Sequence, residues 1–174
     1  SWSTANWSNS IDPWASFSND CQQGIGGCTD SSNINYDPSA TVNDGSCYYY
    51  VKTYVPDDNF EAYLEANGMG NGIWNDDSVY TVNINTVDTL MVYQNISDLT
   101  GIEDFTALIY LDCSFNLITS LDVSANTSLI NLYCLFNQLT SLDVSGATAL
   151  TTLWCLDNQL TSLNVSNNLA LTHL

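Results

Sequence analysis

The sequence predicts a repeat solenoid of α/β type, mostly β, with a parallel sheet, an N-terminal capping helix and a small disulfide-closed loop module. The first observation is a period of 21 residues in the second half of the chain. Cysteines, asparagines and valines all recur at this step. A period of about 20 to 50 residues indicates stacked structural repeats, whereas a metal or catalytic site occurs once. The recurring residues are Cys113, Cys134 and Cys155, then Asn116, Asn137 and Asn158, then Val123, Val144 and Val165.

The repeated unit has the form L-x-x-L-x-C-x-x-N-x-L-T-S-L-x-V-S, which is typical of leucine-rich repeats. Regular units start at Leu108, Leu129 and Leu150, after a divergent one from about residue 81. Leucine and cysteine alternate on a short predicted strand, so we expect both to point inward and to stack from coil to coil. The cysteines are then small buried apolar residues. We expect no zinc site, because neither a His nor a CxxC pair accompanies these cysteines. We also expect no disulfides between coils.

The asparagine follows the strand, where the backbone turns into the next part of the coil. We expect its amide to satisfy backbone groups that the turn leaves without partners.

Four segments precede or form the solenoid. Residues 1–27 are an aromatic, Ser- and Asn-rich arm or linker, residues 28–50 a Cys-closed acidic loop module, and residues 51–80 a helical N-terminal cap. Residues 81–174 are the repeats, incomplete at the C-terminus because "LALTHL" starts another unit. We therefore expect a fragment, a processed form or a subunit capped by a neighbour. The aromatic side chains of the arm favour docking over a plain tether.

The loop module has a cysteine at each end, and a disulfide between Cys28 and Cys47 would stabilise it by about 3 kcal/mol. Such a bond places the protein in an oxidising compartment. The stretch from Gly27 to Cys47, "GCTD...NYDPSA...DGSC", resembles a module of secreted and cell-surface proteins of Bacteroidetes. Its close-spaced oxygen donors also make it a tentative calcium site, although the same residue types form turns. The candidate ligands are Asp30, Asn33, Asn35, Asp37 and Asp44.

The pattern of residues 51–75 predicts one amphipathic helix, which covers the first repeat. Pro56 and two aspartates suit its N-terminus, and Gly68 ends it. The carboxylates Asp57, Asp58 and Glu61 are better explained by a charged first turn than by acid–base chemistry.

Composition excludes several function classes. The chain has 174 residues, one Lys or Arg against 19 Asp and Glu, and a formal charge of -18. Binding of nucleic acid or of an anionic membrane needs clustered basic residues, so neither is expected as a partner. No apolar run long enough to cross a bilayer is present, so we expect no membrane insertion. With a single His and no known catalytic motif, we expect no enzyme.

Residues 51–174 resemble the secreted leucine-rich repeat proteins of Bacteroidetes. The matching motifs are "YVPDDNFEAYL", "NISDLTGIEDFTAL" and "LTSLDVS", and "ISDLTGIEDF" is also similar to internalin-type repeats. This resemblance implies an extracellular or cell-surface protein that serves in binding or adhesion.

The strand positions between the inward residues face outward, on the concave side of the solenoid. They form an apolar and aromatic strip, and Tyr and Trp are common at binding hot spots. We therefore predict a protein or carbohydrate ligand there. The alternative is a self-assembling subunit of an extracellular filament or surface layer, joined through the open ends, the arm and Cys21. The predicted binding residues are Met91, Tyr93, Tyr110, Asp112, Tyr133, Leu135, Trp154 and Leu156.

Glycosylation is a further expectation. Ser78 and Thr89 lie in Asp-Ser/Thr-apolar stretches of the kind that Bacteroidetes glycosylate, and Asn6, Asn95, Asn126 and Asn164 lie in N-x-S/T sequons.

Overall fold

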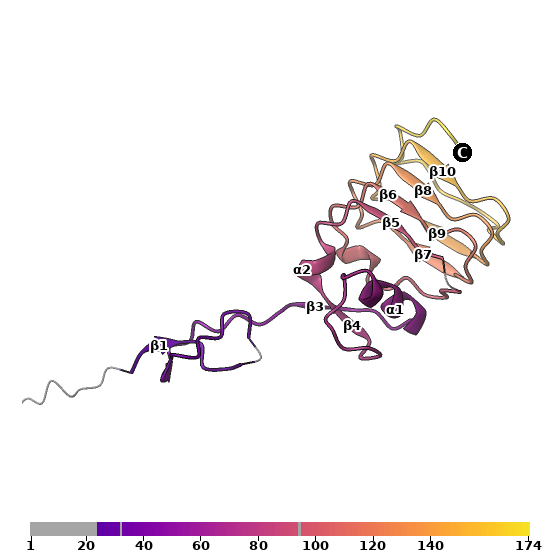
Figure 1. Cartoon of the computed structure of the whole chain (residues 1–174). Helices are drawn as coiled ribbons and strands as arrows, with labels where there is room; N and C mark the ends of the chain where they lie inside the picture. The colour runs from indigo at the N-terminus through magenta and orange to yellow at the C-terminus, as the bar shows by residue number, and fades with distance from the viewer. Residues whose placement is uncertain (1–23, 32, 94) are drawn as a thin grey trace, which may run out of the picture. The chain divides into compact units, whose positions relative to one another are not determined.

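The computed structural model describes residues 24–31, 33–93 and 95–174 (Figure 1). The chain divides into two compact units, Ser1–Tyr49 and Tyr50–Leu174. Residues 1–23, which include most of the predicted arm and Cys21, lie outside the described residues.

The first unit is a small loop module with little regular structure. β1 (Gly26–Gly27) pairs in parallel with β2 (Val42–Asn43), and Cys28 forms an isolated bridge with Tyr36. A disulfide joins Cys28 to Cys47, which confirms the predicted closure of the loop. Side-chain oxygens of Asp and Asn residues accept hydrogen bonds from nearby backbone N–H groups throughout the module. With so few apolar residues inside, the covalent bond and these turns hold the module together.

The second unit starts with the cap. β3 (Lys52–Tyr54) pairs antiparallel with β4 (Ser78–Tyr80), and α1 (Asp58–Ala66) lies between them in the sequence. The short helix α2 (Thr81–Ile84) follows β4.

The helix predicted within residues 51–75 begins after Pro56 and ends before Gly68, as the sequence indicates, whereas the residues before Pro56 form the strand β3. Thr53 and Val55 are buried on alternate positions, as in a strand, and Pro56 disfavours helical geometry in the residue before it. Asp57 is the N-cap, and its carboxylate accepts from the N–H groups of Asn59 and Phe60 at 3.0 Å each. Gly68, with φ of +74°, follows the helix in a left-handed conformation that ends it.

The repeats form two parallel sheets, whose strands are stacked along the solenoid in Figure 1. The larger sheet contains β5 (Thr89–Met91), β6 (Tyr110–Asp112), β8 (Asn131–Tyr133) and β10 (Thr152–Trp154), in that spatial order. The smaller sheet pairs β7 (Ser120–Asp122) with β9 (Ser141–Asp143). A 3-10 helix, η2 (Ile102–Asp104), belongs to the first coil. This is the mostly β solenoid that the repeat predicts.

One continuous core runs from the cap into the coils. Leu111, Leu132 and Leu153 are fully buried and stack strand by strand, and Phe60 of α1 lies with its ring centroid 6.4 Å from that of Phe105. The helix therefore covers the first coil as predicted. Among the described helices, none is long and apolar enough to cross a membrane.

The cysteines behave as the sequence predicts. Cys113 and Cys134 are fully buried free thiols, and Cys155 is a half-buried one. Burial raises the pKa of all three thiols above the ordinary value, so they remain protonated and poorly nucleophilic. They form a ladder of small apolar side chains at one position of successive coils.

The asparagine ladder is also confirmed. Nδ2 of Asn137 donates to the carbonyl oxygens of Cys113 at 2.9 Å and Cys134 at 3.3 Å, while its Oδ1 accepts from the N–H of Ile118 at 3.1 Å. Asn116 and Asn158 make the same set of bonds one coil earlier and one coil later. Each amide thus joins two successive coils by satisfying backbone groups of both.

Candidate interaction face

The outward residues of the larger sheet form the candidate face, which we call the sheet face. Strand pairing places equivalent residues side by side in columns along the solenoid. Leu90 and its equivalents alternate with them and point into the core. One column contains Thr89, Tyr110, Asn131 and Thr152, and the next contains Met91, Asp112, Tyr133 and Trp154.

Three aromatic rings on neighbouring strands touch one another on this face. The ring centroids of Tyr110 and Tyr133 lie 5.3 Å apart, and those of Tyr133 and Trp154 lie 5.5 Å apart in an edge arrangement. Trp154 and Met91 are each 46% exposed. The face therefore presents a continuous aromatic run to solvent, held in place by a rigid sheet.

Asp112 is the one charged residue among the outward positions of this sheet in the described chain. Its Oδ2 accepts from the Tyr93 hydroxyl at 2.8 Å, and its Oδ1 accepts from the N–H of Ser114 at 3.0 Å. Partial burial, followed by the hydrogen bond to Asp112, raises the pKa of Tyr93 to about 12. The carboxylate is thus fixed in orientation while the residue remains partly exposed to solvent.

The strand position after Asp112 on the same side does not face solvent. Ser114 is the next alternate residue after Asp112, but only 2% of it is exposed, and its hydroxyl accepts from the N–H of Leu135 at 3.3 Å. The coil begins to turn at this residue, so the simple alternation of a strand no longer applies.

Two exposed phenylalanines extend the face, and the repeat pattern did not single them out. Phe115 and Phe136 precede the ladder asparagines, are 66% and 48% exposed, and stack with ring centroids 4.6 Å apart. Both have positive φ values, 59° and 50°, as does Asp157 at the same position of the next coil. A left-handed conformation is unfavourable for a bulky side chain but acceptable for Asp. The recurring Phe-Asn pair in the sequence could have indicated that these phenylalanines are exposed. The asparagine of each pair points into the turn, so the residue beside it points outward.

The predicted face therefore has a second part at the ends of the strands. Leu156 is 70% exposed and Leu135 is half-buried, and both lie next to the phenylalanine positions in sequence. We call Leu135, Leu156, Phe115 and Phe136 the apolar edge of the sheet face.

The tentative calcium residues are distributed over turns of the loop module. Asn35 donates from Nδ2 to Ser46 O at 2.6 Å and accepts at Oδ1 from Tyr48 N at 2.9 Å. Asp37 accepts at Oδ1 from the N–H and hydroxyl of Ser39, and Asp44 accepts at Oδ1 from the N–H of Ser46. These bonds show the turn-forming role that the sequence also suggested. Calcium binding by Asp30, Asn33, Asn35, Asp37 and Asp44 stays a prediction.

One cluster of carboxylates occurs elsewhere among the described residues. Ligand atoms of Asp58, Glu61 and Asp77 lie within 4.8 Å of one another. Glu61 is buried and accepts from the N–H groups of Asp76 at 3.1 Å and Asp77 at 3.3 Å, so it holds the loop before β4. Its burial, opposed by these bonds, raises the pKa of Glu61. The cluster is explained by support of the cap.

The predicted glycosylation residues differ in accessibility. Ser78 donates its hydroxyl hydrogen to Asp76 at 2.9 Å within the cap, whereas Thr89 is exposed on the sheet face. Asn126 is fully buried and donates to Ile102 O at 2.8 Å, so folding removes this sequon from solvent. Modification of Ser78 and Thr89 stays a prediction.

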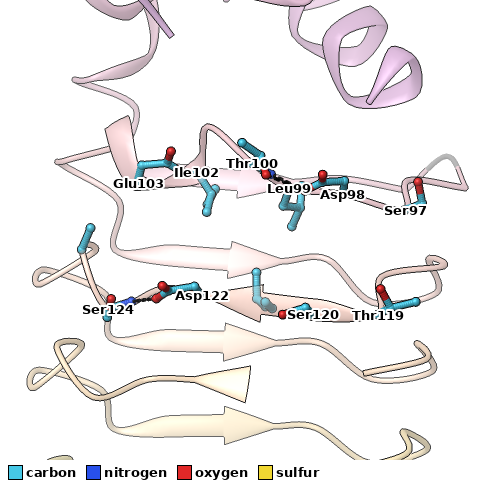
Figure 2. Close-up of a pocket in the computed structure, with 12 residues that line it drawn as sticks. Ser97, Asp98, Leu99, Thr100, Ile102, Glu103, Thr119, Ser120, Asp122 and Ser124 are labelled. Atoms are coloured by element: carbon cyan, nitrogen blue, oxygen red, sulfur yellow. Dashed lines mark hydrogen bonds between the residues drawn. The ribbon is translucent and has the colours of Figure 1, made fainter. Parts of the chain in front are cut away.

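Figure 2 shows a polar groove of about 600 Å³ between residues 97–103 and β7. Its acidic residues are used in local turns. Asp98 accepts from the N–H and hydroxyl of Thr100 at 2.8 Å each, and Asp122 accepts from the N–H of Ser124 at 2.8 Å. The described lining contains no His, Cys or Lys that could act as a nucleophile or base beside these carboxylates.

Comparison with known proteins supports the fold. The sequence matches no protein-family model and no curated protein. Among solved structures, the chain is similar to the functional domain of InlJ from Listeria monocytogenes, which includes a cysteine ladder. The identity is 39% and the TM-score 0.63, over 73% of this chain and 29% of that one. The chain thus spans about three tenths of the InlJ structure.

A second solved structure is the internalin InlF from Listeria monocytogenes strain 4b F2365. It shares 23% identity over 69% of this chain and 43% of that chain, with a TM-score of 0.48. The cysteine ladder of InlJ has its counterpart here in the column that contains Cys113 and Cys134.

Proposed function

We propose that this chain, which is a leucine-rich repeat protein, is a non-enzymatic recognition or adhesion module that binds its partner through the sheet face. The observation that carries the proposal is the exposed strip that runs from Met91 through Tyr133 to Trp154, bordered by the apolar edge. Soluble proteins rarely leave so many apolar side chains contiguous and open to water without a use for them.

The two phenylalanines strengthen this argument. Phe115 and Phe136 adopt an unfavourable backbone conformation and leave large rings in solvent, so neither fold stability nor solubility explains them. Strained, exposed aromatic residues are typical of contact sites, where burial by a partner compensates for the cost.

A protein partner fits this surface better than a glycan. Recognition of a sugar needs several polar groups that match its hydroxyls. The column with Thr89, Asn131 and Thr152 offers some, but the column from Met91 to Trp154 and the apolar edge are mostly apolar or aromatic. Aromatic and aliphatic anchors around one fixed polar group are typical of the centre of protein interfaces.

An extracellular location follows as part of the proposal. The disulfide between Cys28 and Cys47 is a bond that oxidising compartments maintain, and the loop module resembles those of secreted proteins. The charge of -18 keeps such a chain soluble in a salt-containing medium. Self-assembly into a filament or surface layer is the alternative, and a second copy as partner is an outcome of the experiment below.

The experiment is a binding screen against arrayed extracellular proteins, glycans and the chain itself. Three forms are compared: the unmodified chain, Trp154→Ser, and Trp74→Ser as a matched control. Trp74 is 58% exposed in the loop before β4, so its replacement removes a similar exposed indole away from the sheet face. We expect ligands that bind the control normally and bind Trp154→Ser at least about tenfold more weakly. Ligands that bind all three forms equally would contradict the proposal, and binding only to the chain itself would favour self-assembly.

A further inference from the structure

We infer that the sheet face recognises a cationic side chain, specifically an arginine of a protein partner, which is anchored on Asp112. This inference rests on the proposed function and adds the chemistry of the partner. Asp112 is the one charged residue among the outward strand positions of the larger sheet, and aromatic and apolar side chains lie beside it in its column.

The carboxylate of Asp112 is preorganised to bind a ligand. Tyr93 and Ser114 each donate one hydrogen bond to it, which fixes its plane and leaves lone pairs on both oxygens unused. Because a carboxylate oxygen accepts about two hydrogen bonds, a guanidinium can add two parallel bonds to a group already held in place.

Aromatic rings border the carboxylate on the side of the later coils. Tyr133 is the partner of Asp112 on the neighbouring strand, and its ring contacts those of Tyr110 and Trp154. A planar guanidinium seated on Asp112 is within reach of these rings, and Arg favours such contacts more than Lys. Met91, the partner on the other side, can contact the aliphatic part of the same side chain.

The charge of the chain excludes a second copy as the source of this cation. The whole sequence contains one Lys or Arg, Lys52, whose Nζ is 2.9 Å from both Asp76 Oδ2 and Ser78 Oγ within the cap. An acidic chain with an acidic anchor therefore complements a different, basic protein. The same charge speeds the approach of such a partner over long range.

Two small probes test the inference: N-acetyl-arginine-amide and N-acetyl-citrulline-amide, which has the same shape without the charge. Each is titrated into the unmodified chain, Asp112→Asn and Asp122→Asn, and binding is followed by the NMR signals of residues 110–115, 131–136 and 152–156. Asp122→Asn is the matched control because Asp122 also accepts from the N–H two residues later, lies on the smaller sheet and carries the same charge. The Asn variant of Asp112 keeps an acceptor for Tyr93, so the face remains folded.

We expect the arginine probe to shift signals around Asp112, Tyr133 and Trp154, and the citrulline probe to leave them unchanged. Asp112→Asn should weaken arginine binding by about tenfold or more, while Asp122→Asn should keep it. Shifts spread over the acidic surface, or equal binding by the Asp112 and Asp122 variants, would overturn the inference. If a glycan or neutral peptide needs Trp154 but is indifferent to Asp112→Asn, the cationic anchor is wrong while the proposed function stands.

Discussion

The ring of Phe115 stacks on the ring of Phe136 with centroids 4.6 Å apart and an interplanar angle of 16°, although both residues have a left-handed backbone. The stack connects two successive coils on the outside of the solenoid, parallel to the asparagine ladder inside it. Inside, Asn116 and Asn137 satisfy the backbone of the turns. Outside, the same turns expose aromatic rings. The asparagine position therefore stabilises the fold, and the phenylalanine position before it is available for contact with a partner.

Replacement of Phe136 by Asn separates these two roles. Asn tolerates positive φ far better than Phe, and Asp157 occupies this position in the next coil. We expect the free energy of unfolding to stay the same or to rise by up to about 1 kcal/mol, since relief of backbone strain offsets the lost stack. Chemical denaturation measures this change, and partner binding by the same variant should weaken. A loss of several kcal/mol would mean that the ring is a structural element.

Replacement of Asn137 by Leu should destabilise the repeats. The variant leaves the buried N–H of Ile118 without its acceptor, and the carbonyl of Cys113 loses one of the two amides that donate to it. An orphaned buried group costs about 1 to 3 kcal/mol, so we expect a loss of about 2 kcal/mol in denaturant unfolding. Gln138→Leu is the control, because it makes a similar change at the exposed neighbouring position. Equal stability of the two variants would refute the role assigned to the ladder.

Tyr93 should ionise at a higher pH than an ordinary tyrosine. Burial and the hydrogen bond to Asp112 raise its pKa to about 12, above the ordinary value near 10. Because the folded-state pKa is raised, the associated stability is present in full below about pH 10 and is lost as pH rises through 12. Ultraviolet titration of phenolate should show a late step that Tyr93→Phe removes. If the late step persists in that variant, the Tyr93–Asp112 bond is not formed in solution.

The stability of the cap should depend on pH through the carboxylate of Asp76. Burial alone would raise its pKa, but hydrogen bonds from Lys52, Asn71 and Ser78 lower it to about 2. Since the folded-state pKa is depressed, the stability from this group is present above about pH 4 and is lost as pH falls through 2. We expect Asp76→Asn to be less stable than the unmodified chain at neutral pH and equally stable near pH 2. Thermal unfolding across this range checks it, and a constant difference at every pH would contradict it.

The period of 21 residues was enough to predict the coil, the direction of the side chains and the two inner ladders. These features follow from local alternation and from the stacking of equivalent positions, so Leu111, Cys113 and Asn116 could be placed without coordinates. The column of Met91, Asp112, Tyr133 and Trp154 follows from the same register.

The features that the sequence did not predict depend on backbone geometry or on contacts between residues far apart in the chain. The strand at Lys52–Tyr54 forms because Ser78–Tyr80 returns to pair with it, and no pattern around residue 52 alone indicates that partner. The left-handed turn at Phe115 and the inward rotation of Ser114 arise where the coil leaves the strand, which a period of two cannot describe. The bond from Tyr93 to Asp112 joins different coils and needed coordinates to be seen.

The most direct test of the account is a hydrogen-exchange footprint of the chain with and without a partner found by the screen. Binding through the sheet face predicts slower exchange in β6, β8 and β10 and in the turns at Phe115 and Phe136, with β7 and β9 unchanged. Protection confined to the smaller sheet, or to the loop module of residues 28–47, would contradict the account.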